Sequence, residues 1–535
     1  MTALQALLLS LLVALSGSAA VFAHEDEQPA ALGDEKLGRV EFPISCNADA
    51  QREFNRGVAI LHSFYYPDAV KSFTRVTQLD AHCAMGHWGV AMSWWYPLWF
   101  PPTQEALAQG SAAVERAQAS APPTRREQDY IAAIAAFYRD ADKLDHASRA
   151  AAYQRAIERV YRNYPDDHEA AAFYALALQA TADPNDKRYT NQIESGAILE
   201  ELYAAQPDHP GVAHYLIHAY DYPELAPKAL DAARHYGQIA PSMPHALHMP
   251  SHTFIMLGLW DESIESNLQA KAAAEKIGWV QERVHTMDYL VYAYLQGGQE
   301  QAARAIVDEL NSVHIAERHT LVMDYAIAAA PARFAVERRR WSEAAELATL
   351  SGSAFPASDA VAHYVRALGF ARSGTPQAAA AELRKLAEIK ALLFQRKQDY
   401  WAKQIDIQYQ TAAAWIAWAE RDRETALTAM RRAVDLEAST YKHPIMPAPL
   451  LPARELLADL LLEAGEPQQA LLEYEASLAL VPNRFNSLYG AAQAAQRSGD
   501  AAKADRYYAH LLSACAKADT ESPELQRARQ FSARH

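Results

Sequence analysis

The sequence predicts an all-α solenoid of about twelve helical hairpins. Half of the 535 residues are hydrophobic or aromatic and alanine is frequent, a composition typical of closely packed helices. A chain of this length exceeds one globular core, so it forms either several domains or a repeat array. A repeat decides between them, because Gly465 and Gly499 are 34 residues apart, as are Ala470 and Ala504.

The same period recurs in the middle of the chain. His214 and His218 are four residues apart, as are His248 and His252, and the second pair follows the first by 34 residues. Four residues make about one helical turn. We therefore expect equivalent helices of neighbouring repeats to carry matching histidine pairs, with His214 opposite His248 and His218 opposite His252.

Two segments carry a family resemblance. Leu478 to Asn483 ends one repeat, and Leu257 to Ser263 contains the turn and the helix start of another. With the 34-residue period they resemble the tetratricopeptide repeat superfamily over nearly all of the mature chain. The resemblance implies helical hairpins, with the first helix of each facing a concave groove that holds ligands. It implies no particular function, because this fold has many unrelated partners.

The N-terminus has the features of an export signal. Leu7 to Leu15 is almost wholly apolar, Ser16 to Ser18 ends the run, and small residues precede a cleavage site after Ala23. No later stretch of 18 or more apolar residues follows, so we expect no transmembrane segment. We expect an exported bacterial protein that is periplasmic or secreted.

Six parts are expected along the chain. They are a signal peptide at 1–23, a disordered acidic leader at 24–40, degenerate hairpins at 41–206, histidine-rich central repeats at 207–312, further repeats at 313–442 and C-terminal repeats at 443–535.

Three cysteines are present. Cys46 and Cys83 precede the first helices of the first two expected repeats, and an oxidising compartment permits a disulfide between them. Such a bond stabilises the end of an array that lacks a neighbouring repeat. The alternative is a metal cluster of Cys83 with His82 and His87. Cys515 is expected to be a buried core residue.

The net charge of −15 argues against a nucleic-acid partner, since no basic stripe is present to neutralise phosphates. A protein or peptide partner is the expectation. Motifs for catalysis are scarce: the sequence has no HExxH helix, no Gly-rich phosphate loop and no GxSxG turn. We therefore assign no catalytic residue.

Eight residues form the candidate metal site. On an ideal helix each local group of histidines and aspartates falls on one face. Imidazoles on adjacent helices supply nitrogen ligands, and carboxylates supply oxygen ligands or orient the imidazoles. The candidates are His214, His218, Asp221, His245, His248, His252, His285 and Asp288. Zinc or copper suits imidazole ligands, whereas calcium does not.

Three interpretations of the histidines remain open. They bind a transition metal, they hold a peptide or carboxylate ligand in a polar groove through imidazole hydrogen bonds, or they are core residues satisfied by neighbours such as Tyr215, Tyr220 and Tyr222. Pro250 lies between two of the histidines and must kink the helix or start a new one. The expected function is an exported scaffold that binds a protein or peptide partner in its concave groove, with a metal site at its centre. The alternatives are a metal-dependent hydrolase and a purely structural adaptor.

Overall fold

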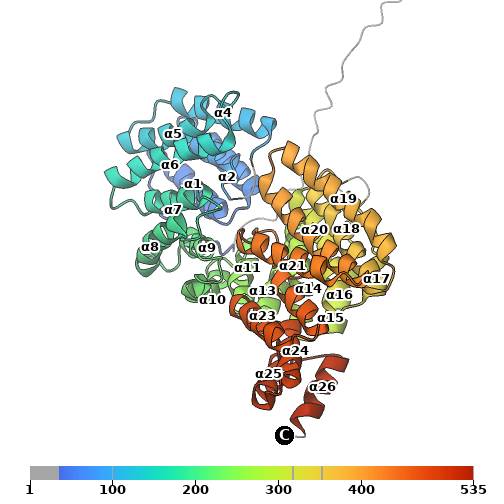
Figure 1. Ribbon diagram of the computed structural model, residues 1–535. Coiled ribbons are helices and arrows are strands. Elements are labelled where there is room, and N and C mark those ends of the chain that lie inside the picture. The colour runs from blue at the N-terminus through green and yellow to red at the C-terminus, as the bar shows by residue number, and fades with distance from the viewer. Residues whose placement is uncertain (1–34, 99–100, 316–318, 351–352, 534–535) are drawn as a thin grey trace, which may run out of the picture. The chain divides into compact units, whose positions relative to one another are not determined.

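The computed structural model describes residues 35–98, 101–315, 319–350 and 353–533. Across these residues all regular structure is helical and no strand occurs (Figure 1). The predicted all-α class is confirmed. Within the described part of the chain, no helix is both long and apolar enough to cross a membrane. The expected signal peptide, residues 1–23, lies outside the described residues.

The helices follow one another with short connections. The first part contains α1 (Ala48–His62), α2 (Tyr66–Leu79), α3 (Ala84–Ser93), α4 (Gln104–Ala119), α5 (Arg125–Tyr138), α6 (His146–Asn163), α7 (His168–Ala180) and α8 (Thr190–Ala205). The central part contains α9 (Pro210–Ala219), the 3-10 helix η1 (Ala226–Ala229), α10 (Leu230–Ile239), α11 (Pro244–His248), α12 (Pro250–Met256), α13 (Trp260–Ile277), α14 (Val280–Gln296) and α15 (Glu300–Leu310).

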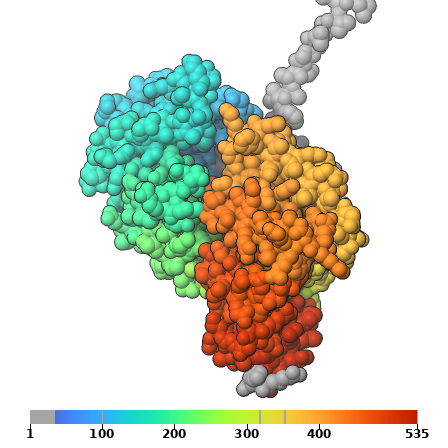
Figure 2. All heavy atoms as spheres, viewed as in Figure 1, coloured from blue at the N-terminus to red at the C-terminus, as the bar shows by residue number. Residues whose placement is uncertain are grey.

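The remaining helices complete the array. They are α16 (Leu321–Glu337), α17 (Trp341–Ala345), α18 (Pro356–Arg372), α19 (Pro376–Gln395), α20 (Asp399–Ala419), α21 (Arg423–Ala438), α22 (Ala453–Glu463), α23 (Pro467–Leu480), α24 (Phe485–Arg497), α25 (Ala501–Ala514) and α26 (Pro523–Ser532). Most successive helices pack against each other as hairpins. In the space-filling view the central part meets the C-terminal repeats (Figure 2), and there the Trp260 indole donates to the Asn483 carbonyl over 3.0 Å.

Local sequence sets where these helices begin and end. Asn47 and Thr124 precede α1 and α5, and their side chains accept hydrogen bonds from the first free backbone amides of those helices. Gly465 and Gly499, the pair that revealed the repeat, adopt φ values of 80° and 82° after α22 and α24. These left-handed conformations cost glycine little, so the turn glycines are where the period predicts them.

The described end of the expected leader is held in place. Lys36 N donates to Ser242 Oγ over 2.9 Å, and Arg39 N donates to the Asp208 carbonyl over 2.9 Å. Leu37 and Val40 are buried in the core. The prediction of disorder is therefore wrong for residues 36–40, because their apolar side chains and backbone amides find partners in the central part.

Residues 441–452, which we name the strap, join α21 to α22. The strap lies against the central helices. The Tyr289 hydroxyl donates to the Pro444 carbonyl over 2.9 Å, and the Arg333 guanidinium donates to the Ala448 carbonyl over 2.7 Å. Ile445 is fully buried. The strap therefore forms part of the interior.

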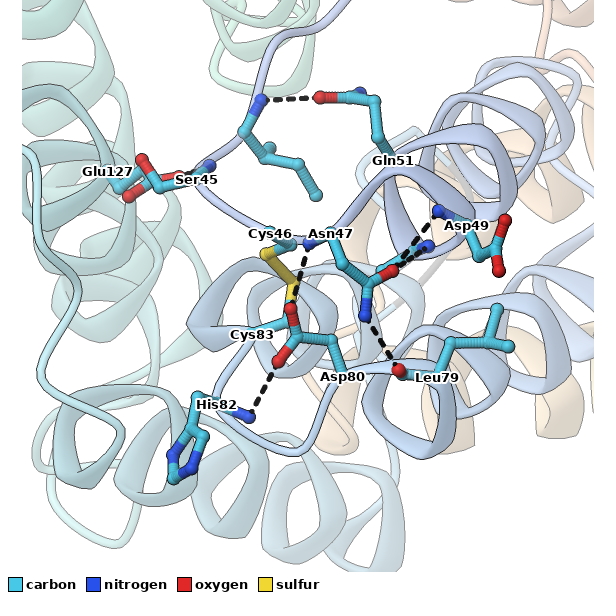
Figure 3. Close-up of a disulfide and its surroundings, with 12 residues drawn as sticks. Ser45, Cys46, Asn47, Asp49, Gln51, Leu79, Asp80, His82, Cys83 and Glu127 are labelled. Carbon is cyan, nitrogen blue, oxygen red and sulfur yellow. Dashed lines mark hydrogen bonds between the residues drawn. A yellow bond between two sulfur atoms is a disulfide. The ribbon is translucent and has the colours of Figure 1, made fainter.

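The predicted disulfide is present. Cys46 and Cys83 are bonded, with their α-carbons 5.4 Å apart (Figure 3). Next to the bond, Asp80 accepts from the backbone amides of Asn47 and His82 over 2.9 and 3.1 Å, which ties the start of α1 to the turn before α3. The bonded sulfur of Cys83 is not a thiolate ligand, so the alternative metal cluster at this place is wrong.

Replacing both bridged cysteines, as Cys46→Ser with Cys83→Ser, should lower the free energy of unfolding. A cross-link over 37 residues contributes about 3–4 kcal/mol through the entropy of the unfolded chain. The measurement is thermal unfolding with and without a thiol reductant. Reductant should lower the midpoint of the parent and of a Cys515→Ala control equally and leave the double variant unchanged. Equal midpoints for parent and double variant would contradict the assignment.

Candidate metal centre

All eight predicted site residues lie inside the protein. Their exposed fractions run from 0% to 7%. The expectation that they face an accessible concave groove is therefore wrong. The turn between α1 and α2 covers them through Phe64, and the strap covers them through residues such as Pro444. Because the histidines are enclosed, every lone pair and N–H of their rings needs a partner inside the protein.

The first histidine triad consists of His214 and His218 from α9 and His245 from α11. One ligand nitrogen of each lies within 4.8 Å of the others. The Phe64 ring closes this triad, with its centroid 4.4, 5.7 and 6.0 Å from the three imidazole centroids in that order.

The second histidine triad consists of His248 from α11, His252 from α12 and His285 from α14. Their ligand nitrogens also lie within 4.8 Å of one another. The Nε2 atoms of His248 and His252 are 3.2 Å apart, and the Tyr289 hydroxyl oxygen lies 3.1 Å from the Nε2 of His252. Figure 1 shows α9, α11 and α14, three of the helices that supply the two triads.

The observed grouping differs from the predicted pairing. His214 lies beside His245, with ring centroids 5.0 Å apart, and not opposite His248. The predicted neighbours His218 and His252 do lie side by side, at 6.1 Å. His245 takes the place beside His214, and Pro250 begins a new helix after α11 ends at His248. The expected histidine pairs are replaced by two groups of three.

Oxygen acceptors fix the protons of four of these rings on Nδ1. The Nδ1 of His245 donates to Glu282 over 3.0 Å, and that of His252 donates to Asp221 over 2.9 Å. Two acceptors are uncharged: His214 donates to the His62 carbonyl over 2.5 Å, and His248 donates to the Asn267 side-chain oxygen over 2.7 Å. In a neutral imidazole held this way the Nε2 carries a lone pair. This is the arrangement in which outer groups orient metal-ligating histidines.

The two aspartates of the predicted site have different partners. Asp221 accepts from His252 and from the Lys442 ammonium, which is 3.0 Å away. It therefore orients a ring of the second triad and holds the strap. Asp288 forms a fully buried ion pair with Arg333 over 2.8 Å. It joins neither triad, so the expectation that it closes the site beside His285 is not met.

Burial keeps the imidazoles neutral. It lowers the pKa of His248 from 6.5 to about 4 and holds those of His214, His218, His252 and His285 well below 6.5, with neighbouring positive groups adding to the effect. At neutral pH these rings therefore offer lone pairs and are not cations.

A third cluster was not predicted from the sequence. His62 of α1 and His209 before α9 both donate from Nε2 to Glu169 of α7, each over 2.9 Å. The Tyr215 hydroxyl donates to His62 Nδ1 over 2.8 Å, and the Val212 amide donates to His209 Nδ1 over 3.2 Å. All four ring nitrogens of the two histidines have hydrogen-bond partners. The cluster therefore links α1, α7 and the start of α9. No spacing signal could reveal it, because its members come from distant repeats.

No family model and no curated protein matches the sequence. Solved structures do match. They include a tetratricopeptide repeat protein from Parabacteroides merdae, with 13% identity and a TM-score of 0.32 over 63% of this chain and 99% of that one.

Two other matches cover more of this chain. Human IFIT1, solved as a dimer with m7Gppp-AAAA, shares 13% identity over 89% of this chain and 91% of its own, with a TM-score of 0.36. Yeast Tom70 shares 12% identity over 91% and 95%, with a TM-score of 0.32. The description of the fold and of the site therefore depends on the helices and residues of this protein alone.

Acidification should destabilise the metal-free protein. Below pH 6.5 the unfolded chain takes up protons at these histidines, whereas the folded chain does so only at lower pH because their pKa values are lowered. The free energy of unfolding should therefore fall as pH drops from about 6.5 toward 4, by about 1.4 kcal/mol per pH unit for each such histidine. Asp221 and Asp288, whose pKa values are raised from 3.8 by burial, offset part of this loss.

The measurement is denaturant unfolding of the chelator-treated protein at pH 7.5 and pH 5.5. Equal stability at the two values would contradict the assignment of these rings as buried and neutral. The variant His235→Gln, which removes a half-exposed histidine of α10, should show the same pH dependence as the parent.

Proposed function

We propose that this protein is a helical-repeat scaffold whose two histidine triads each bind one divalent transition-metal ion, zinc or copper. The observation that carries the proposal is the 3.2 Å separation between the Nε2 atoms of His248 and His252. Both rings have their proton on Nδ1, so at this distance two lone pairs face each other. A cation between them turns this repulsion into coordination.

The neighbouring hydroxyl and amide groups donate their hydrogens elsewhere, and two oxygen acceptors hold the Lys442 ammonium. The Tyr289 hydroxyl has one hydrogen, and it goes to the Pro444 carbonyl, which is only an acceptor. The Lys442 ammonium donates to Asp221 over 3.0 Å and lies 3.4 Å from the Met446 carbonyl. The side-chain amide of Asn267 donates to the Ser263 carbonyl, which leaves its oxygen facing His248. A metal ion is therefore the occupant that satisfies these nitrogens.

The first triad supports the same conclusion by a different route. The Nε2 atoms of His214 and His218 are buried and have no hydrogen-bond partner among the described residues. An unsatisfied buried acceptor costs about 1–3 kcal/mol. Coordination of one ion by three neutral imidazoles removes that cost, and nitrogen ligands favour zinc or copper over calcium or magnesium.

The scaffold role extends to a protein or peptide partner. Stacked helical hairpins present extended surfaces suited to such partners. The strap supports this view, since the central helices hold a non-helical segment through Tyr289 and Arg333, which donate to its carbonyls, and through Tyr325, which contacts the Met446 sulfur. Because the strap already lies against these central helices, a partner would bind the outer repeats or displace the strap.

We also propose that the protein acts in an oxidising compartment, as the export signal in the sequence suggests. The Cys46–Cys83 bond supports this location, because disulfides persist in the periplasm and in secreted proteins and are rare in the cytosol.

Metal analysis of the purified protein without a histidine tag tests the proposal. About two zinc or copper ions per chain are expected. The paired changes His218→Gln with His245→Gln, and His252→Gln with His285→Gln, should each remove about one ion. Glutamine fills most of the ring's space, which matters because alanine would leave a cavity at these buried positions.

The surface change His235→Gln is the matched control and should keep both ions. Helix content from circular dichroism confirms that each variant is folded. A folded parent that binds neither metal after incubation with zinc or copper salts would refute the proposal. Equal metal content in the parent and both paired variants would refute the site.

A further inference from the structure

The two triads are closed by different aromatic side chains. Phe64 covers the first triad with a ring that has no polar atom. Tyr289 lies among the rings of the second triad, with its centroid 4.6 Å from that of His248, 5.1 Å from that of His252 and 5.1 Å from that of His285. The Tyr289 ring at the second triad therefore carries an oxygen atom, whereas the Phe64 ring at the first does not.

Donor spacing in the second triad matches tetrahedral coordination. Zinc–nitrogen bonds of about 2.0 Å give a tetrahedron with edges of about 3.3 Å between ligand atoms. The two Nε2 atoms of His248 and His252 are 3.2 Å apart, and the Tyr289 oxygen is 3.1 Å from the second of them. The two nitrogens and the phenolic oxygen are therefore spaced as ligands on two edges of such a tetrahedron. No hydrogen lies between the two nitrogens to account for their short separation.

We propose that the phenolic oxygen of Tyr289 is the fourth ligand of the metal ion held by His248, His252 and His285. The second site then has three nitrogens and one oxygen, whereas the first has three nitrogens and the Phe64 ring. This inference rests on the proposed function and goes beyond it, because it assigns a ligand that the sequence pattern did not indicate and makes the two sites chemically distinct.

Coordination changes one bond of the strap. In the metal-free protein the Tyr289 O–H donates to the Pro444 carbonyl. When the metal–oxygen bond forms, the O–H bond breaks and the proton passes to the solvent buffer. The Pro444 carbonyl then loses its donor. Lys442 and Arg333 still hold the strap at Asp221 and at the Ala448 carbonyl, so the strap stays in place but with one contact fewer.

Copper(II) titration of the full-length protein tests the assignment. A phenolate bound to copper(II) gives a ligand-to-metal charge-transfer band in the visible range, which imidazole ligands alone do not give. The band should accompany one of the two copper equivalents. Tyr289→Phe should lose the band and bind that equivalent at least tenfold more weakly, while the other equivalent is unchanged.

Tyr325→Phe is the matched control. It also removes a buried hydroxyl that contacts the strap, at the Met446 sulfur, and it should keep the band. Resonance Raman excitation in the band of the parent protein supplies a measurement that needs no variant, since phenolate ring modes should be enhanced.

The outcomes separate the two proposals. Two bound coppers without a phenolate band, or a folded Tyr289→Phe variant that keeps the band, would overturn the Tyr289 assignment and leave the metal-binding function standing. A parent protein that binds no copper and no zinc would overturn both.

Discussion

The central part of this protein depends on hydrogen bonds that hold buried neutral imidazoles by their Nδ1 atoms. Each bond joins parts of the chain that are distant in sequence: His214 to the His62 carbonyl of α1, and His252 to Asp221, which in turn binds Lys442 of the strap. Burial makes these bonds necessary, because an unpaired N–H in an apolar interior is costly. The same bonds fix the direction of the Nε2 lone pairs, so the packing of the helices and the chemistry of the centre have one cause.

Buried ion pairs also join distant parts of the chain, in the helices that follow the histidine triads. Arg333 pairs with Asp288 and reaches the strap carbonyls, and Arg484 pairs with Glu337 and Glu455 with no exposed surface. Taking such charges out of water is expensive unless every donor has an acceptor. Their side chains cross between helices of different repeats, so they specify which helices meet, whereas the many buried alanines only allow close approach.

Much of the fold and part of the site follow from the sequence. The 34-residue period located the turn glycines, Cys46 and Cys83 were paired correctly, and all six histidines of the triads were among the candidates. The pairing of His214 with His248 was wrong because His245, which has no histidine 34 residues before it, lies beside His214. The residues that cover the histidines were not predicted either. Phe64 and the strap reach the histidines from far away in the chain, and periodicity within a helix carries no information on such contacts.

The span of chain that meets at the centre has a consequence for the order of folding. The histidine segment occupies a short stretch of sequence, yet its enclosure needs Phe64 on one side and Pro444 on the other. Bringing these residues together closes a loop of several hundred residues, which local helical contacts alone do not require and which slows the final step of assembly. A fragment holding only the central repeats would fold its helices but leave its imidazoles open to water and without their orienting partners. The centre is therefore a property of the completed chain, and truncation at either side removes it before it removes the helices.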